Sequence, residues 1–216
     1  MKWVFPLLIL FCTSLPVSAQ LKLGLRMGMS TTMVDANQVD IPGPAGGDFL
    51  KIGLDKAHFG IHGGLIIQAR LGRFLLQPEL LLNSNRVDYR VDDLTGATVE
   101  SAIRTEKFQY LDLPLFLGVQ AGPFHLQAGP EAHFFINSSS ELFDYEGYEQ
   151  KFDQATFGWI AGVGLDVWNL MLDLRYEGNF SKFGSHITFN GQQYAFDNSP
   201  SRILLSLGVL LGKRKK

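Results

Sequence analysis

The side chains that could bind a metal ion or transfer a proton lie in a few alternating segments of the sequence. His58 and His62 share one face of such a segment, and so do His125 and His133. A metal site requires ligands that converge from neighbouring elements, with further residues that orient them, and spacing along one strand provides neither. We therefore expect these histidines to join a polar network, and the sequence predicts no metal-ligating residue.

The sequence patterns give no indication of catalysis or cofactor binding. Gly60, Gly63 and Gly64 do not precede a helix-like segment, so they predict no phosphate-binding loop. Serine, histidine and aspartate occur in the long polar stretches without a spacing that marks an activated nucleophile. We expect no catalytic residue, no cofactor and no enzymatic activity. The formal net charge of −2 also argues against a nucleic-acid partner.

β-strands must position these side chains, and the clearest pair of strands lies between Tyr110 and Ile136. Apolar and polar residues alternate along both arms of this stretch, which is the period of a strand between two unlike environments. One face of each arm is apolar throughout, and the opposite face mixes glycine with charged residues. Residues 121–124 interrupt the alternation, which predicts a tight turn between two antiparallel strands.

Eight alternating segments occur in the chain, and they predict an all-β fold, an eight-stranded antiparallel transmembrane up-and-down β-barrel. The segments are 21–30, 58–70, 74–84, the two arms of the 110–136 hairpin, 157–168, 170–180 and 202–212. Short turns at 71–73, 121–123 and 169–170 alternate with long polar loops at 31–57, 85–106, 137–156 and 181–201. Short turns at one end, long loops at the other and an even strand count are typical of outer-membrane barrels.

Alternation alone leaves open which face points outward, and a secreted soluble barrel with an apolar interior is the alternative. The polar face is rich in glycine and carries both charges in mid-strand, which favours a cramped interior over a solvated surface. The charged residues assigned to it are Lys22, Arg26, Arg70, Arg175 and Arg202 with Glu79, Asp112, Glu131, Asp166, Asp173 and Glu177. An eight-stranded barrel is only wide enough for its own side chains. We therefore expect ion pairs to fill the lumen, with a small-solute pore as the alternative.

Aromatic residues gather where the segments meet the loops and turns, as in the two interfacial girdles of a membrane barrel. At the loop end they are Phe59, Phe108, Tyr110, Phe134, Phe157, Trp159, Tyr176 and Phe180, and at the turn end Phe74 and Phe124.

The first 19 residues predict a secretory signal peptide. Lys2 precedes an apolar run, and small residues ending at Ala19 resemble a cleavage site. Cleavage there would remove Cys12, the only cysteine, and leave residues 20–216 as one barrel domain with a basic tail at 213–216. The domain contains no later apolar run of helical spanning length.

Several short motifs resemble those of the small outer-membrane β-barrel family of Bacteroidetes, described as porin family or PorT-type. They are the runs at 77–80, 110–115, 128–130, 161–165 and 172–176, which read QPEL, YLDLPL, AGP, AGVGL and LDLRY. The resemblance covers the mature chain and implies an eight-stranded Gram-negative outer-membrane barrel, with one type of member tied to protein secretion. The chain differs from many outer-membrane barrels in ending on basic residues instead of an aromatic one.

The long loops are the candidates for function. Alternation continues past residue 84, so 85–107 predicts a hairpin that protrudes from the barrel, and Asn190-Gly191 predicts a second hairpin at 186–196. Exposed strand edges of this kind can pair with a partner protein or only stiffen the rim. We expect a monomer in outer-membrane lipid with its termini in the periplasm, and a structural or surface-contact role. A secretion-accessory role and a lipid-modifying enzyme are alternatives.

Two further expectations concern strand pairing. A turn at 121–124 pairs residues whose numbers sum to 245, so Asp112 should face His133, and Pro114 should face Glu131, inside the barrel. Pro78, Pro114 and Pro130 fall in mid-strand without an N–H, and each should interrupt a ladder or cause a bulge.

Overall fold

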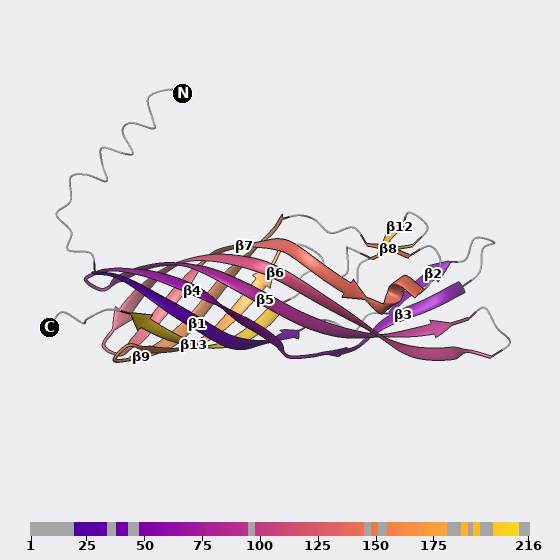
Figure 1. Ribbon diagram of the computed structural model, residues 1–216, viewed down its shortest axis with the longest axis horizontal. Coiled ribbons are helices and arrows are strands. Elements are labelled where there is room, and N and C mark those ends of the chain that lie inside the picture. Colours follow the sequence, from indigo (N-terminus) through magenta and orange to yellow (C-terminus); the bar gives the residue numbers. More distant parts are fainter. Residues whose placement is uncertain are drawn as a thin grey trace, which may run out of the picture.

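The computed structural model describes residues 20–33, 38–42, 48–94, 98–144, 148–150, 155–180, 187–189, 192–194 and 201–211. The molecule is elongated, with a closed barrel at one end and strands that continue beyond it at the other (Figure 1). No helix among the described residues is long and apolar enough to cross a membrane. The signal-peptide segment with Cys12, and the basic tail, lie outside the described residues.

Eight antiparallel strands form the barrel, as the alternation predicted. They are β1 (Gln20–Met33), β4 (Gly60–Leu71), β5 (Phe74–Asp93), β6 (Glu100–Ala121), β7 (Phe124–Ser140), β9 (Ala155–Val167), β10 (Leu170–Asn179) and β13 (Ser201–Leu211). Each pairs with its neighbours in the order β5-β4-β1-β13-β10-β9-β7-β6, and the pairing of β5 with β6 closes the ring. The three short turns lie together at the end of the barrel away from β2 and β3 (Figure 1).

Two predicted boundaries were wrong. The third short turn occupies Trp168 and Asn169, because Trp168 takes a positive φ of 57°, as Gly72 and Gly122 do in the other two turns. The second strand begins at Gly60, so His58 precedes it and does not share a strand face with His62.

The faces of the barrel point as predicted, with the apolar side chains outward. Leu117 and Leu126 of β6 and β7 are exposed, while His125, Glu131 and His133 on the opposite face are buried. The interior is rich in charged side chains beside two small apolar clusters, and this excludes the soluble barrel with an apolar core. Most of the predicted girdle residues are exposed, but Phe108 is buried and Tyr110 is half-buried because both face inward near the loop end.

The predicted register of the central hairpin is confirmed. Gln120 pairs with His125, Pro114 with Glu131 and Asp112 with His133. Beyond Tyr110 the register shifts by one residue, at a bulge between Gln109 and Tyr110. The lumenal pairing is thus set by the turn and holds over the whole of the membrane-spanning part of the hairpin.

Each of the three mid-strand prolines lies beside an interrupted ladder, as expected. The β4–β5 ladder stops at Ile66–Glu79 and resumes at Ala69–Leu76, next to Pro78. The β5–β6 ladder is interrupted in the same way next to Pro114, and the β6–β7 ladder next to Pro130. The register is the same on both sides of each gap, so the prolines remove bridges without adding a residue.

Beyond the barrel, strands β5 and β6 continue as a four-stranded sheet that we call the projecting sheet. It consists of β2 (Gln38–Pro42), β3 (Asp48–Ala57), residues 86–93 of β5 and residues 100–107 of β6. The hairpin predicted at 85–107 is confirmed by pairing from Asn85–Phe108 to Asp93–Glu100. The 31–57 segment was predicted to be a loop, and this was wrong because β3 pairs with β5 and β2 pairs with β3.

An apolar cluster separate from the barrel wall supports the projecting sheet. Its buried members are Ile41, Leu50, Ile52, Val87, Tyr89, Val91, Phe108 and Leu142, and Leu54 and Tyr110 pack against them. Leu142 comes from η1 (Glu141–Asp144), a single turn that follows β7. Burial of several such side chains, at about 1.5–3 kcal/mol each, gives these strands a core of their own.

The predicted hairpin near Asn190-Gly191 is also confirmed. Strand β11 (Ile187–Phe189) pairs with β12 (Gln192–Tyr194), and β8 (Tyr148–Gln150) pairs with the other side of β11. The loops predicted at 137–156 and 181–201 thus contain short strands, which form a second, three-stranded sheet.

Two adjacent glycines of β4 provide a test of barrel packing. A Cβ at Gly64 would lie 1.9 Å from the backbone oxygen of Leu80, whereas a Cβ at Gly63 would come no closer than 3.4 Å to Arg26. We expect Gly64→Ala to lower the free energy of unfolding by about 1–3 kcal/mol or more, because backbone must move. Gly63→Ala, the matched control, should change it by less than about 0.5 kcal/mol. Urea unfolding in detergent micelles, followed by tryptophan fluorescence, measures both, and equal effects would contradict the packing described.

Candidate functional site

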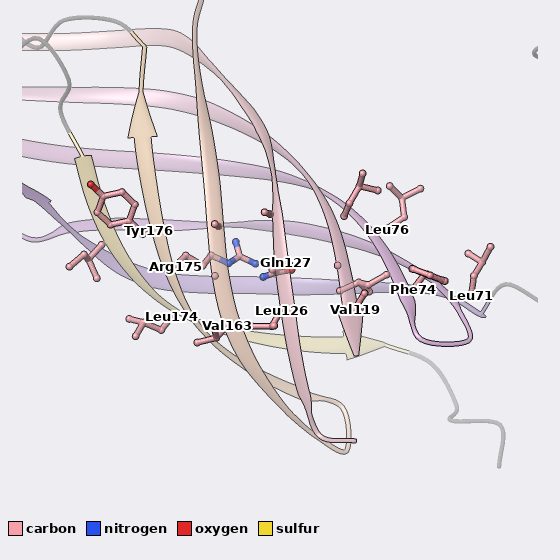
Figure 2. Close-up of a pocket in the computed structure, with 17 residues that line it drawn as sticks. Leu71, Phe74, Leu76, Val119, Leu126, Gln127, Val163, Leu174, Arg175 and Tyr176 are labelled. Carbon is pink, nitrogen blue, oxygen red and sulfur yellow. The ribbon is translucent and has the colours of Figure 1, made fainter. Parts of the chain in front are cut away.

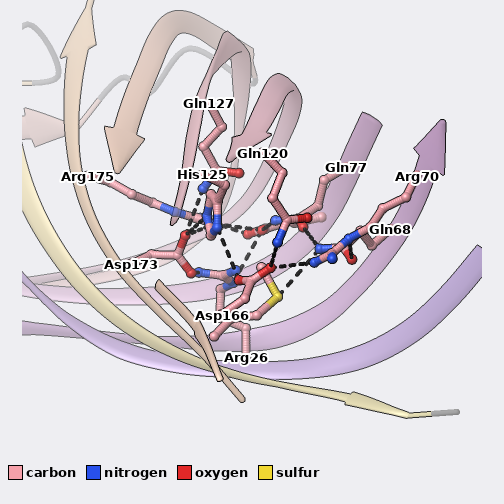
Figure 3. Close-up of polar contacts among 12 residues, drawn as sticks. Arg26, Gln68, Arg70, Gln77, Gln120, His125, Gln127, Asp166, Asp173 and Arg175 are labelled. Atoms are coloured by element: carbon pink, nitrogen blue, oxygen red, sulfur yellow. Dashed lines mark hydrogen bonds and ion pairs between the residues drawn. The ribbon is translucent and has the colours of Figure 1, made fainter. Parts of the chain in front are cut away.

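Inside the barrel, one group of polar side chains is organised around Arg175, and we call it the Arg175 network. Arg175 donates two hydrogen bonds to Glu79, at 2.9 and 2.8 Å, and its guanidinium lies 4.3 Å from the ring centre of Phe116. Arg26 lies between Glu79, at 3.2 Å, and Asp173, at 2.7 Å. Gln77 donates to Glu79 and Gln127 donates to Asp173 (Figure 3). These side chains come from β1, β5, β7 and β10, so the network crosses the lumen.

The Arg175 network continues to the short-turn end through His125 and Asp166. The imidazole of His125 lies between two carboxylates, with Nε2 2.8 Å from Asp173 and Nδ1 3.1 Å from Asp166. Asp166 also pairs with Arg70 and accepts a hydrogen bond from Gln120 at 3.0 Å (Figure 3). The turn end of the lumen is therefore bridged by charged side chains.

A second group lies nearer the loop end, and we call it the Asp112 cluster. Its members are Asn83, Asp112, Glu131, His133, Glu177 and Arg202, all of them buried. Arg202 donates two hydrogen bonds to Glu177, at 2.8 and 2.6 Å, and lies 3.4 Å from Asp112. Asp112 also accepts a hydrogen bond from Asn83 at 2.7 Å and contacts Nδ1 of His133 at 2.8 Å. The predicted proximity of Asp112 and His133 inside the barrel is confirmed.

Inward-facing glycines allow side chains to reach across a strand. His125 and Asp173 both pair with Gly164, and a Cβ there would lie 2.2 Å from the His125 ring. In the same way, Gly28 pairs with His62 on one side and with Ser206 on the other. Nε2 of His62 lies 2.8 Å from Oγ of Ser206. Glycine at these positions therefore opens the space that two side-chain contacts need.

Ion pairs occupy much of the lumen, as the sequence predicted. The five cationic and six acidic side chains assigned to the polar face are all buried or half-buried. Removing one partner of a buried pair leaves an uncompensated charge, so these groups depend on one another. An arrangement of this kind leaves the side chains little freedom to move aside for a solute.

Two groups among the described residues bring a hydroxyl close to a histidine or a carboxylate, one at the loop end and one in the lumen. At the rim, Asp88 contacts His58 at 2.7 Å and accepts a hydrogen bond from Thr105 at 2.9 Å, so the hydroxyl binds the carboxylate and not the imidazole. Burial raises the pKa of the Asp88 carboxyl, but hydrogen bonds from His58, Thr105 and Arg86 outweigh it and hold the pKa below its usual range. His62 and Ser206 are in contact, but both are buried in the lumen. An activated nucleophile needs a hydroxyl bonded to an imidazole, a carboxylate that orients the imidazole, and access for a substrate. Neither of these two groups combines all three.

An apolar depression of about 1100 Å³ lies on the outside of the barrel (Figure 2). Large side chains such as Leu76, Leu126 and Leu174 surround the small residues Ala128 and Ala161. Most of its lining is apolar and exposed, and Gln127 and Arg175, which also line it, are buried members of the Arg175 network. An apolar outer surface of this kind suits contact with lipid chains.

The sequence located the lumenal charges but not all of their contacts. Asn83 bonds Asp112 of the next strand along the chain, whereas Ser206 contacts His62 of β4, which it can reach only because β13 pairs with β1 when the ring closes. His58 was predicted to face the lumen and instead contacts Asp88 of the projecting sheet. The sequence did contain one signal for these contacts, the glycines on the inward face. A glycine there leaves room for side chains from the two neighbouring strands to meet across its own strand.

Comparison with solved structures finds other outer-membrane proteins. The Neisserial surface protein A matches with 12% identity and a TM-score of 0.45, over 89% of this chain and 98% of the other. AlkL matches with 11% identity and a TM-score of 0.47, over 91% and 93%. The outer membrane protease OmpT of Escherichia coli matches with 11% identity and a TM-score of 0.44, over 92% and 99%. A comparison with curated proteins finds no match.

A family model gives the firmest assignment. The model described as outer membrane protein beta-barrel domain matches residues 14–200, which include seven of the eight barrel strands and reach the start of the eighth. The closed ring, its apolar outer face and its charged interior agree with that description. This chain belongs to the outer membrane protein beta-barrel domain family and is an outer-membrane β-barrel protein.

Proposed function

We propose that this protein is a non-enzymatic, monomeric surface-contact protein, which binds a protein partner through the projecting sheet. The observation that supports this proposal most strongly is the apolar cluster that gives the projecting sheet a core of its own outside the barrel. A loop that served only to connect two strands would not need eight buried apolar side chains. In this proposal the barrel is the anchor in outer-membrane lipid, and the sheet is the working part.

The tip of the β5–β6 hairpin carries exposed apolar side chains. Val99 is 60% exposed and Ile103 is 48% exposed, on a surface that also bears Arg86, Arg90 and Lys107. Apolar side chains with a polar surround are typical of a protein contact surface. The paired lumen favours this function over a pore, and the geometry at His58 and Ser206 gives no support to a lipid-modifying enzyme.

The orientation follows from the same proposal. The projecting sheet and the β8–β11–β12 sheet lie on the cell surface, and both termini and the short turns lie in the periplasm, after removal of a signal peptide at 1–19. The resemblance to PorT-type barrels of Bacteroidetes adds a secretion accessory as one form of the contact role, with the partner a component of the secretion pathway.

Photo-crosslinking in living cells tests the proposal. A photoreactive amino acid at Val99 or at Ile103 should give a crosslinked protein of defined mass, because both side chains would face the partner. The same amino acid at Leu174, on the lipid-facing side of β10, is the matched control and should give no protein adduct.

Orientation is measured on the same strains. Cys12 lies in the predicted signal peptide, so Val99→Cys and Arg73→Cys would each place one thiol in the mature chain. A membrane-impermeant maleimide should label the Val99 variant in intact cells and the Arg73 variant only after lysis. The proposal fails if Val99 and Ile103 give no adduct in folded protein, or if Arg73 is the residue labelled from outside.

A further inference from the structure

The Asp112 cluster has an excess of negative charge that the rest of the lumen does not share. Its three carboxylates, Asp112, Glu131 and Glu177, face one guanidinium, that of Arg202, which leaves two negative charges when His133 is neutral. The remainder of the lumen has the opposite balance, with Lys22, Arg26, Arg70 and Arg175 against Glu79, Asp166 and Asp173. Two buried charges of one sign require neutralisation by two protons or by one divalent cation.

Three atoms in this cluster are buried and have no hydrogen-bond partner among the described residues: Oδ1 of Asn83, Oε2 of Glu131 and Nε2 of His133. Glu131 and His133 are only 2% and 5% exposed and lie two positions apart on β7. Oε1 of Glu177 lies 3.8 Å from Nε2 of His133, too far for a hydrogen bond. Buried polar atoms normally have partners, so those of Glu131 and His133 point to a bound species.

The geometry around His133 is that of a metal ligand with its orienting group. Nδ1 of His133 lies 2.8 Å from Asp112, and in a neutral ring that donates to this carboxylate Nε2 is the nitrogen with the lone pair. A carboxylate that holds the far nitrogen of a ligating histidine is the usual support for a zinc site. Asp112, Glu131 and His133 each place one ligand atom within 4.8 Å of the others.

We infer that the Asp112 cluster binds one first-row divalent transition-metal ion, of the Zn²⁺ type, inside the barrel. Glu131 and Nε2 of His133 hold the ion, Glu177 flanks it and Asp112 orients the imidazole. Glu177 can flank the ion because its Oε1 lies 3.8 Å from Nε2 of His133, a little more than the roughly 3.3–3.6 Å that separates two tetrahedral ligands at 2.0–2.2 Å. Imidazole with carboxylate suits zinc and its neighbours better than Ca²⁺ or Mg²⁺, which prefer oxygen alone.

The proposed site differs from the sequence-based expectation of no metal ligand. Glu131 and His133 are two apart on one strand, and Asp112 lies opposite His133 on the next. The two ligands therefore lie on one strand, and the residue that orients His133 lies on the paired strand, at positions that the predicted register already placed together. The ion would stabilise the wall of the barrel from inside, and it would enter as the strands close, since its ligands are buried.

Metal content after refolding tests the inference. The untagged protein, and Glu131→Gln and His133→Gln variants, are refolded into detergent with Zn²⁺, treated briefly with a chelator, desalted and analysed for zinc by mass spectrometry. We expect about one zinc ion per chain in the natural protein and at least roughly tenfold less in both variants. His62→Gln, which replaces another buried lumenal histidine, and His58→Gln at the rim are matched controls that should retain zinc.

Thermal unfolding gives a second readout that does not depend on activity. Zn²⁺ during refolding should raise the unfolding midpoint of the natural protein, since a ligand that binds only the folded state stabilises it. Glu131→Gln should fold without metal at least as well as the natural protein, because it removes an unpaired buried charge, and should not respond to Zn²⁺. Less than about 0.1 zinc ion per chain in the natural protein, or as much zinc in Glu131→Gln and His133→Gln as in the natural protein, would overturn the site and leave protons as the neutralising species.

Discussion

Replacing Arg175 with methionine is expected to lower the free energy of unfolding by about 3–5 kcal/mol. The guanidinium makes two hydrogen bonds to Glu79 and is fully buried, so its loss leaves a carboxylate in the lumen with only Arg26 as a cationic partner. Methionine keeps most of the side-chain volume and the contact with Phe116, so the change measures charge rather than packing. Urea unfolding in lipid vesicles, followed by tryptophan fluorescence, gives the value.

A double variant and a surface control identify the cause. Glu79→Gln combined with Arg175→Met should be more stable than Arg175→Met alone, because the unpaired charge is gone. Arg90 pairs with Asp55 at 3.0 Å, and the two side chains are 55% and 32% exposed. Arg90→Met should therefore lower the free energy of unfolding by less than about 1 kcal/mol. A cost for Arg175→Met no larger than for Arg90→Met would contradict a lumen held together by buried ion pairs.

The second large effect is expected on the outer face, at Leu174. Leucine 174 is 52% exposed in the middle of β10, and its neighbours Asp173 and Arg175 point inward. Leu174→Arg should lower the free energy of unfolding in a bilayer by about 2–4 kcal/mol, because the guanidinium would lie at the depth of the hydrocarbon core. The same substitution at Leu170, the first residue of that strand, should cost about 0–1 kcal/mol, since it lies at the interface.

The difference between Leu174→Arg and Leu170→Arg distinguishes a membrane barrel from a water-soluble one. On a solvated surface, both substitutions would fall within about 0.5 kcal/mol of zero. A depth-independent result in vesicles would therefore contradict the assignment of the exposed apolar face to lipid.

The strands of the barrel and the faces of their side chains could be predicted because both depend on residues that are close together in the sequence. Alternation with a period of two assigns each residue to a face, and a two-residue turn fixes the register of the strands on either side of it. The pairing of Asp112 with His133 follows from the position of Gly122 and from that count alone. The balance of lumenal charges follows in turn from the faces.

The projecting sheet could not be predicted in the same way. Strand β2 has only five residues, and Ile41, Leu50 and Ile52 stand in a polar segment whose alternation is weak. Their burial depends on contact with Val87, Tyr89 and Val91 of another segment, which is a tertiary effect. The contacts of His62 with Ser206, and of Arg175 with Glu79, depend on how the ring closes and on the shear between strands, which alternation does not specify.

Ion conductance of the purified protein in a planar lipid bilayer tests the central claim most directly. The claim is that the lumen is closed by the Arg175 network and the Asp112 cluster, so that the barrel acts as an anchor and the projecting sheet carries the function. Folded protein inserted into the bilayer should therefore give no steps of current above the leak of the membrane alone. Stable, voltage-proportional steps from inserted protein would contradict the claim and identify the barrel as a pore.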